Sequence, residues 1–237
     1  MSTYVLIHGA WHGGWCWDKV IPVLEHQGHK VEAPDLPGHG GDKTPLSKIS
    51  LEAYVNRVCE ILDAQSNPVI LVGHSMGGIV ITQGAEYRPD KISTLVYLSA
   101  YLPRNGESLL QLVHGDTESL LMPNTIMAED KSSATLRDER IKEVLYGDCT
   151  DEDVARAKSF LVPQAGAPLA TPVKTSEEKF GRVRRVYISC LRDRAVTPTC
   201  QERMYTNLPC ERVITMDTSH SPFFSAPGEL ARHLLSL

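Results

Sequence analysis

The chain has 237 residues, six of them cysteine, and a formal net charge of −5. This length suits a single α/β domain, whose core would be large enough to be stable without a disulfide or a metal ion. The acidic balance and the lack of long basic runs predict no nucleic-acid partner. The densest basic cluster, Arg182, Arg184 and Arg185, is interpreted as a solvated strand edge.

The cysteines and the N-terminal segment predict a soluble, cytoplasmic protein. The six cysteines form no C-x-x-C pair and most lie within apolar patterns, which is typical of reduced packing residues. The N-terminal residues lack the basic and apolar segments of a signal peptide. No apolar run approaches the roughly 18 residues that a membrane helix needs, so no membrane partner is expected. A homodimer is compatible with the sequence.

Short apolar runs alternate with helical patterns along most of the chain. The runs at residues 4–7, 29–33, 69–72, 94–98, 182–190 and 213–216 predict strands. Helices are predicted at 17–27, after an N-cap at Ser50, from the turn at 73–78 to about 88, from Thr197-Pro198 onward, and at 229–235. Strands separated by helices predict a parallel sheet with right-handed crossovers.

Residues 102–181 lack this strand rhythm and contain five prolines. Thr150 and Asp153 have the spacing of a capping box, which predicts a helix start there. We interpret this segment as a mostly helical cap on one edge of the sheet. The predicted organisation is a core of residues 1–101 and 182–237, with residues 102–181 inserted as the cap.

Gly73-His74-Ser75-Met76-Gly77 matches the pattern G-x-S-x-G between a fully apolar strand and a helix. In that setting the turn is so tight that the residues flanking the serine must be small, hence Gly73 and Gly77. The serine hydroxyl then stands at the carboxyl end of the sheet, beside a helix N-terminus that favours developing negative charge. Ser75 is therefore the predicted nucleophile.

A serine hydroxyl needs a base, and in this arrangement an acid and then a histidine follow the serine along the chain. His220 lies four residues beyond the last predicted strand and is the predicted base. Asp193 lies three residues after the preceding strand and is the predicted acid, which would orient His220 and stabilise its imidazolium. Asp217 is a second candidate acid, ranked lower because it lies only three residues from His220.

The loop after the first strand is expected to complete the site. Backbone N–H groups of Ala10 and Met76 are the predicted donors to an oxyanion, while His8 and Gly9 shape the loop. A role for His8 as a second base is a weaker alternative. His8 and His12 stand four apart on a loop without H-E-x-x-H, so no metal site is predicted. No phosphate or dinucleotide motif is present, and the chemistry needs no cofactor.

Several stretches of the chain resemble the α/β-hydrolase superfamily. They are most similar to its branch of plant methylesterases and hydroxynitrile lyases, with bacterial esterase and pyrethroid-hydrolase-like relatives. The resemblance implies an α/β-hydrolase fold with a mostly parallel, doubly wound sheet and a small cap inserted after the equivalent of the family's sixth strand. The stretches are 5–17, similar to V-L-V-H-G-x-C-H-G-A-W-C-W, 33–40, similar to A-x-D-L-x-x-x-G, 187–193, similar to the segment with the family's acid, and 220–225, similar to H-x-P-x-x-S.

The branch contains esterases and lyases, and two positions favour an esterase. Lyase members have a threonine where Gly9 stands and a lysine where Ser221 stands, and these groups handle the cyanohydrin oxygen and the cyanide. The expected activity is hydrolysis of small to medium carboxylic esters. The alternatives are a hydroxynitrile lyase, a C–C bond hydrolase, or a weakly catalytic ligand receptor. Apolar cap residues that either line a substrate pocket or form cap core are Leu109, Leu110, Leu112, Leu120, Leu121, Phe160 and Leu161.

Overall fold

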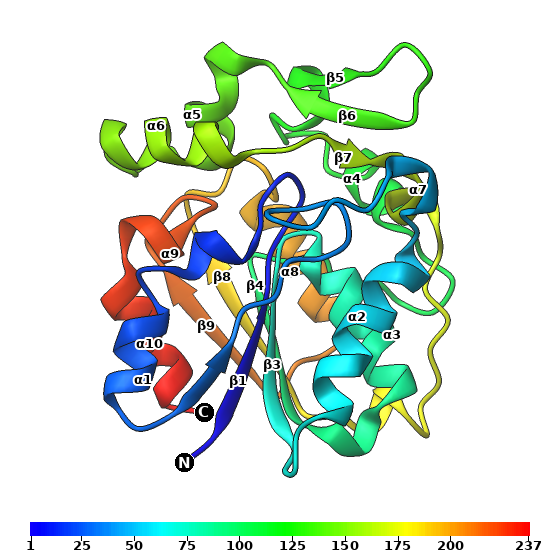
Figure 1. Ribbon diagram of the computed structural model, residues 1–237, viewed down its shortest axis with the longest axis vertical. Helices are drawn as coiled ribbons and strands as arrows, with labels where there is room; N and C mark the ends of the chain where they lie inside the picture. Colours follow the sequence, from blue (N-terminus) through cyan, green and yellow to red (C-terminus); the bar gives the residue numbers. More distant parts are fainter.

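The computed structural model describes all residues 1–237, and its centre is a six-stranded sheet in which every neighbouring pair is parallel. The strands in spatial order are β2 (Lys30–Glu32), β1 (Thr3–Ile7), β3 (Val69–His74), β4 (Ile92–Leu98), β8 (Arg185–Cys190) and β9 (Arg212–Met216). Every residue of β3 is buried, as expected of a central parallel strand. The parallel α/β-hydrolase sheet predicted from the sequence is confirmed (Figure 1).

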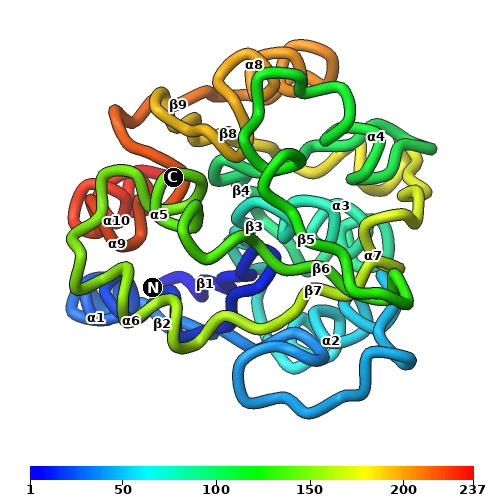
Figure 2. Tube along the Cα trace, turned by 90° about the horizontal axis from the view of Figure 1, so that it is seen from above, coloured from blue at the N-terminus to red at the C-terminus, as the bar shows by residue number.

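Helices cover both faces of the sheet. Figure 2 shows α1 (Ile21–His26) and α10 (Pro227–Leu235) on one face, and α2 (Leu51–Asp63) and α3 (Gly77–Tyr87) on the other. α8 (Pro198–Asn207) packs against β8, and the short α9 (Pro222–Ser225) leads into α10. None of the helices combines the length and the apolar character that crossing a bilayer requires. Single 3₁₀ turns are formed by Gly14–Trp17, Leu46–Lys48, Pro89–Lys91, Met122–Asn124, Asp138–Arg140 and Phe180–Arg182.

Two predicted helix starts are confirmed by their capping hydrogen bonds. The Ser50 hydroxyl accepts from the N–H of Ala53 at 3.0 Å, and the Thr197 hydroxyl accepts from the N–H of Cys200 at 3.2 Å. Each bond satisfies one of the N–H groups that a helix N-terminus leaves free. The helix predicted at 17–27 begins later, at Ile21, after the 3₁₀ turn Gly14–Trp17.

The strand predicted at 182–190 is shorter than expected. β8 begins at Arg185, because Phe180–Arg182 form a 3₁₀ turn. The Arg185 guanidinium stabilises that turn: it donates to the carbonyls of Phe180 and Gly181 and lies 5.0 Å from the Phe180 ring centroid. Arg184 pairs with Glu211 and Arg182 pairs with Asp90, so two of the three arginines of this cluster have carboxylate partners.

Residues 102–170 lie over the carboxyl ends of the strands, and the segment that follows runs down along α3, where the N–H groups of Ser176 and Phe180 donate to Glu86 (Figure 1). The regular structure of residues 102–181 is mostly helical, as predicted, but it also includes a small antiparallel sheet in the order β5-β6-β7 that the sequence did not predict. Its strands have two to four residues, too few to show an alternating pattern, and they form because their backbones pair. The elements are α4 (Leu109–His114), β5 (Thr125–Met127), β6 (Ser133–Leu136), α5 (Ile141–Leu145), α6 (Asp151–Phe160), β7 (Gln164–Ala165) and α7 (Gly166–Ala170).

The expected start of a helix at Thr150 is confirmed. The Thr150 hydroxyl accepts from the N–H of Asp153 at 3.2 Å, and α6 begins at Asp151. Three acidic residues occupy the first turn of α6, where their negative charges interact favourably with the positive end of the helix dipole.

Candidate active site

Ser75 occupies a tight turn between β3 and α3. Its φ is +52°, in the left-handed region. This conformation is energetically unfavourable for any residue other than glycine. Three backbone hydrogen bonds hold this conformation: the Ser75 N–H donates to the Leu98 carbonyl at 3.3 Å, and the Ser75 carbonyl accepts from Gly78 and Tyr101 at 3.0 and 3.1 Å. The surroundings therefore impose the conformation that presents the hydroxyl at the end of the sheet.

The glycines around Ser75 have no room for a side chain. A Cβ on Gly73 would lie 2.8 Å from the backbone of Gly77, and a Cβ on Gly77 would lie 2.8 Å from the Ile7 carbonyl oxygen. Real Cβ atoms do not approach backbone this closely, so β3, α3 and the end of β1 can pack together only with glycine at both positions. The sequence motif therefore reflects a steric requirement of this turn.

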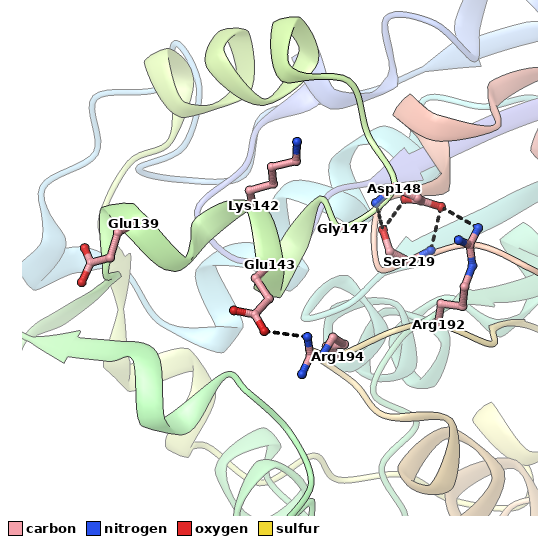
Figure 3. A pocket seen from close by; sticks show the side chains of 8 residues that line it. All are labelled: Glu139, Lys142, Glu143, Gly147, Asp148, Arg192, Arg194 and Ser219. Atoms are coloured by element: carbon pink, nitrogen blue, oxygen red, sulfur yellow. Dashed lines mark hydrogen bonds and ion pairs between the residues drawn. The ribbon is translucent and has the colours of Figure 1, made fainter.

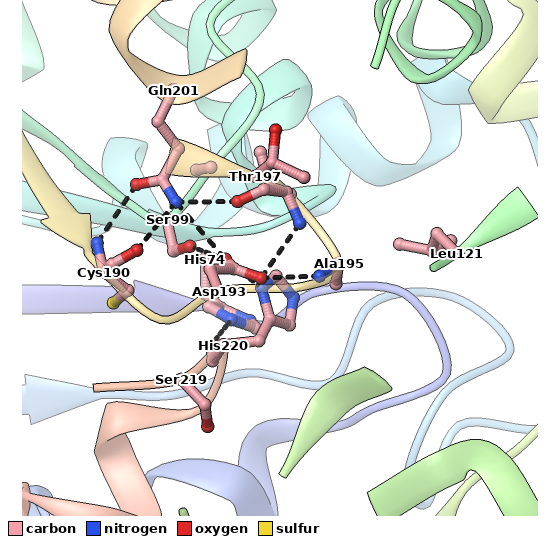
Figure 4. A network of polar contacts seen from close by, with 12 residues as sticks. His74, Ser99, Leu121, Cys190, Asp193, Ala195, Thr197, Gln201, Ser219 and His220 are labelled. Atoms are coloured by element: carbon pink, nitrogen blue, oxygen red, sulfur yellow. Dashed lines mark hydrogen bonds and ion pairs between the residues drawn. The ribbon is translucent and has the colours of Figure 1, made fainter. Parts of the chain in front are cut away.

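His220 and Asp193 meet across two loops that follow β9 and β8. The His220 Nδ1 lies 2.7 Å from Asp193 Oδ2, and both side chains are almost fully buried. A carboxylate can only accept, so Nδ1 is the donor, and Nε2 is the ring nitrogen left without a partner. Figure 4 shows this pair within a wider polar network.

Asp193 accepts hydrogen bonds on both carboxylate oxygens. Oδ1 accepts from the N–H groups of Ala195 and Val196 at 2.7 and 3.0 Å, which form the turn leading to α8. Oδ2, the oxygen that faces His220, also accepts from the Ser99 hydroxyl and, at 3.5 Å, from Gln201 (Figure 4). Ser99 and Gln201 are absent from the sequence prediction. Only the position of Ser99 directly after β4 could have indicated it.

Asp217, the second candidate acid, does not face His220. Its side chain is 80% exposed, and its Oδ1 pairs with Arg192 Nε at 3.0 Å. The structure thus brings Asp193, and not Asp217, to the imidazole.

His74 connects the His220 loop to the Ser75 turn. The His74 Nε2 donates to the His220 carbonyl at 2.9 Å, and the two ring centroids are 4.6 Å apart. Burial lowers the pKa of His74 well below its ordinary value, and the neighbouring His220 ring adds to this effect. His74 immediately precedes Ser75, so its contact with His220 places the His220 imidazole next to the serine turn. The Ser75 hydroxyl makes no hydrogen bond to His220 here; such bonds commonly tighten only when substrate binds.

Two unpaired N–H groups lie beside Ser75. The backbone nitrogens of Ala10 and Met76 make no hydrogen bond within the chain, although both residues are buried. A buried N–H without a partner is rare in folded proteins and carries a free-energy cost. Ala10 and Met76 line the same cavity as Ser75.

His8 and Gly9 shape the loop that carries Ala10. The His8 Nδ1 donates to the Gly9 carbonyl at 2.8 Å, and its Nε2 accepts from the N–H of Leu36 at 3.1 Å. Both ring nitrogens are thus engaged in backbone hydrogen bonds, and burial lowers the pKa of His8 well below its ordinary value. This geometry disfavours His8 as a second base. No group of three or more His, Cys, Asp or Glu side chains in the chain could hold a metal ion.

A cavity of about 280 Å³ opens above Ser75, between the sheet and residues 102–181. Twelve of its sixteen lining residues are hydrophobic and none is Asp, Glu, Lys or Arg. Trp11 forms part of the cavity wall, and its indole N–H donates a hydrogen bond to the Ala134 carbonyl at 2.9 Å. The cavity therefore favours neutral, apolar groups.

Only some of the apolar cap residues line the cavity. Leu109, Leu110 and Leu121 line it above Ser75, and Leu109 and Leu121 also belong to the main hydrophobic core. Leu112, Leu120 and Leu161 belong to, or pack against, that core without lining the cavity, and Phe160 is 46% exposed. The sequence pattern could not separate these two groups, because both are apolar.

Asp148 joins the cap to the loops of His220 and Asp193. Figure 3 shows its carboxylate bonded to both the N–H and the hydroxyl of Ser219, with the N–H at 2.9 Å from Oδ2. Arg192 Nη2 lies 3.4 Å from the same oxygen. Close by, Arg194 pairs with Glu143 of α5 at 2.6 Å. The residues adjacent to both His220 and Asp193 are thus held by one cap carboxylate, which the sequence did not predict.

Replacing Asp148 by alanine is expected to lower the free energy of unfolding by about 1–3 kcal/mol, because the largely buried Ser219 groups lose their acceptor. Urea denaturation of the purified protein measures this. Asp151→Ala is the matched control: Asp151 is 91% exposed and pairs only with Lys142, so a change within about 0.5 kcal/mol is expected. Equal losses in both variants would contradict a stabilising role of the Asp148 contacts to Ser219 and Arg192.

Comparisons with known proteins identify the family of this chain. The model of the alpha/beta hydrolase family matches residues 4–233. A pyrethroid hydrolase of Sphingobium wenxiniae is 35% identical over 98% of this chain and 85% of its own length, and methylesterase 7 of Arabidopsis thaliana is 34% identical over 100% and 96%. The crystal structure of a pyrethroid hydrolase from Sphingobium faniae superposes with a TM-score of 0.90 at 32% identity, over 99% of this chain and 96% of that one. The chain belongs to the alpha/beta hydrolase family.

Proposed function

We propose that this protein is a serine carboxylesterase that hydrolyses small to medium, neutral carboxylic esters. The observation that carries the proposal is the position of Ser75 in an apolar cavity. Two unpaired backbone N–H groups line that cavity, and a buried histidine–aspartate pair lies next to the serine turn. The similar proteins named as a pyrethroid hydrolase and a methylesterase support the same reaction class.

In the proposed reaction, the Ser75 hydroxyl oxygen attacks the ester carbonyl while His220 Nε2 takes its proton. Asp193 keeps the second imidazole proton on Nδ1 and stabilises the imidazolium that forms. The carbonyl oxygen gains negative charge and accepts from the N–H groups of Ala10 and Met76. The tetrahedral intermediate collapses as His220 returns the proton to the departing alcohol. Water then attacks the acyl-enzyme by the same route and releases the acid.

The cavity supports a neutral substrate on physical grounds. A charged ester group would lose its hydration without gaining a counter-charge, because no acidic or basic side chain other than His114 lines the cavity. Its volume of about 280 Å³ suits a ligand of small to medium size.

The geometry at Gly9 argues against the alternative of a hydroxynitrile lyase. A Cβ at this position would lie 2.8 Å from the Ser75 Cβ and 2.9 Å from His74 Nδ1. The threonine of the lyases therefore does not fit this loop without displacing Ser75 or His74. Ser221, at the position of the lyase lysine, is fully buried and provides no positive charge.

The proposal is tested by labelling the protein with a fluorophosphonate and then assaying a panel of p-nitrophenyl and methyl esters. We expect the label on Ser75, multiple turnover, and higher kcat/KM for neutral than for charged esters. Cyanide release from mandelonitrile without ester hydrolysis would favour a lyase. Saturable binding of a ligand with neither labelling nor turnover would favour a receptor.

A further inference from the structure

Two histidines hold the peptide units on either side of Ala10. The His8 Nδ1 donates to the Gly9 carbonyl at 2.8 Å, and the His12 Nδ1 donates to the Ala10 carbonyl at 2.7 Å. A peptide unit is planar and its C=O and N–H point in opposite directions, so fixing the Gly9 oxygen aims the Ala10 N–H. Fixing the Ala10 oxygen holds the peptide plane between Ala10 and Trp11. The two peptide planes that meet at the Ala10 Cα are then both fixed.

The hydrogen bonds of His12 require one tautomer. A carbonyl oxygen only accepts, so the proton must be on Nδ1. Burial lowers the pKa of His12 to about 4, so the ring is neutral at pH 7 and Nε2 carries a lone pair. The Tyr146 hydroxyl lies 2.6 Å from that Nε2 and donates to it.

Tyr146 comes from the cap, directly after α5, and is fully buried. The other groups around the His12 ring are Trp15, Phe223 and His74, with ring centroids 5.3 to 6.1 Å away, and none of them hydrogen-bonds to Nε2. Tyr146 is therefore the single polar partner of this nitrogen. A buried lone pair without its donor would cost free energy and would remove the preference for the Nδ1–H form.

We propose that Tyr146 and His12 are positioning residues through which the cap orients the oxyanion-binding loop. The Tyr146 hydroxyl holds His12 in its Nδ1–H tautomer, and His12 holds the Ala10 carbonyl. Together with His8 on the Gly9 carbonyl, this fixes both peptide planes at Ala10 and so directs its N–H to the carbonyl under attack by Ser75. In the opposite tautomer, the Nδ1 lone pair would face the Ala10 oxygen and repel it. This inference rests on the proposed esterase function.

The test begins with Tyr146→Phe, assayed as kcat and KM on a p-nitrophenyl ester. We expect kcat to fall by about 10- to 100-fold with KM nearly unchanged, less than the about 10²–10³ that the loss of a whole oxyanion donor costs. Inhibition by a trifluoromethyl ketone, which resembles the tetrahedral intermediate, should weaken in parallel. Tyr4→Phe is the control, because it removes a buried hydroxyl that bonds to Leu234 away from the cavity, and kcat should not change.

A double-mutant cycle separates positioning from general structural loss. In His12→Asn, the amide nitrogen can occupy the place of Nδ1 and donate to the Ala10 carbonyl without any tautomer to control. Tyr146→Phe is therefore expected to cost little activity in the His12→Asn background. Equal losses in both backgrounds, or an unchanged kcat in Tyr146→Phe, would overturn the inference.

The tautomer itself is read from ¹⁵N chemical shifts of His12 in histidine-labelled protein. Wild type should show a protonated Nδ1 and an unprotonated Nε2, and Tyr146→Phe should shift this distribution. An identical distribution in the variant would overturn the inference, even if the wild-type protein proved to have no esterase activity. Absence of esterase activity in the wild-type protein would contradict the proposed function and not the tautomer control. The two ideas can therefore fail separately.

Discussion

Replacing Ser75 by alanine is expected to lower kcat for ester hydrolysis by a factor on the order of 10⁶, as for removal of a serine nucleophile elsewhere. The change deletes the only oxygen in this turn that can form the acyl-enzyme. The two N–H donors and the cavity remain, so a small residual rate above the uncatalysed reaction should persist. The measurement is the initial rate of p-nitrophenyl acetate hydrolysis by matched preparations.

The Ser75 hydroxyl makes no hydrogen bond within the chain, so alanine should leave the fold and the unfolding free energy almost unchanged. Circular dichroism and a urea titration provide this control. The backbone hydrogen bonds that hold φ of Ser75 at +52° do not involve its side chain, so alanine should keep the same turn and its strain. Retention of more than about one hundredth of the wild-type kcat would contradict Ser75 as the nucleophile, since even one lost oxyanion donor costs about 10²–10³.

Asp193→Asn is expected to lower kcat by about 10⁴, the cost seen when an asparagine replaces the acid of a serine triad. The N–H groups of Ala195 and Val196 point at Oδ1, so the amide oxygen must take that position. The amide NH₂ then faces His220 and donates to Nδ1. His220 is driven to the Nε2–H tautomer, which cannot accept the proton of Ser75.

Asp217→Asn is the matched control for this variant. Asp217 lies three residues before His220, yet it is exposed and paired with Arg192, so kcat should change less than about twofold, as is typical of an exposed surface pair. The ¹⁵N shifts of His220 should show the changed tautomer in Asp193→Asn alone. A larger loss of kcat in Asp217→Asn than in Asp193→Asn would reverse the assignment of the acid.

Much of the core was predictable from the sequence because its signals are local. An apolar strand followed by a turn with glycine on both sides of a serine specifies the conformation at Ser75, and the N-caps Ser50 and Thr197 specify where two helices begin. The order of the elements was predictable because strands and helices alternate. The loops with Asp193 and His220 were then expected at one edge, since parallel strands place their carboxyl ends together.

The cap was predicted less well, because its structure depends on distant pairing. The strands of its sheet are too short to show a period, and β6 pairs with β5 and with β7, which begins about thirty residues later. Which cap leucines line the cavity, and which pack only in the core, depends on how the cap sits over the sheet. Apolar character alone cannot decide between these two environments.

By itself, the sequence determined the parallel core, the turn at Ser75 and the loops in which Asp193 and His220 lie. Only the tertiary structure decided which groups surround them: Ser99 beside Asp193, Asp148 on the loop of His220, and Tyr146 on His12. The reason is physical. Turn and strand conformations follow from steric and hydrogen-bonding preferences of neighbouring residues. A hydrogen bond between residues more than seventy apart in sequence instead exists only after the cap has packed over the sheet.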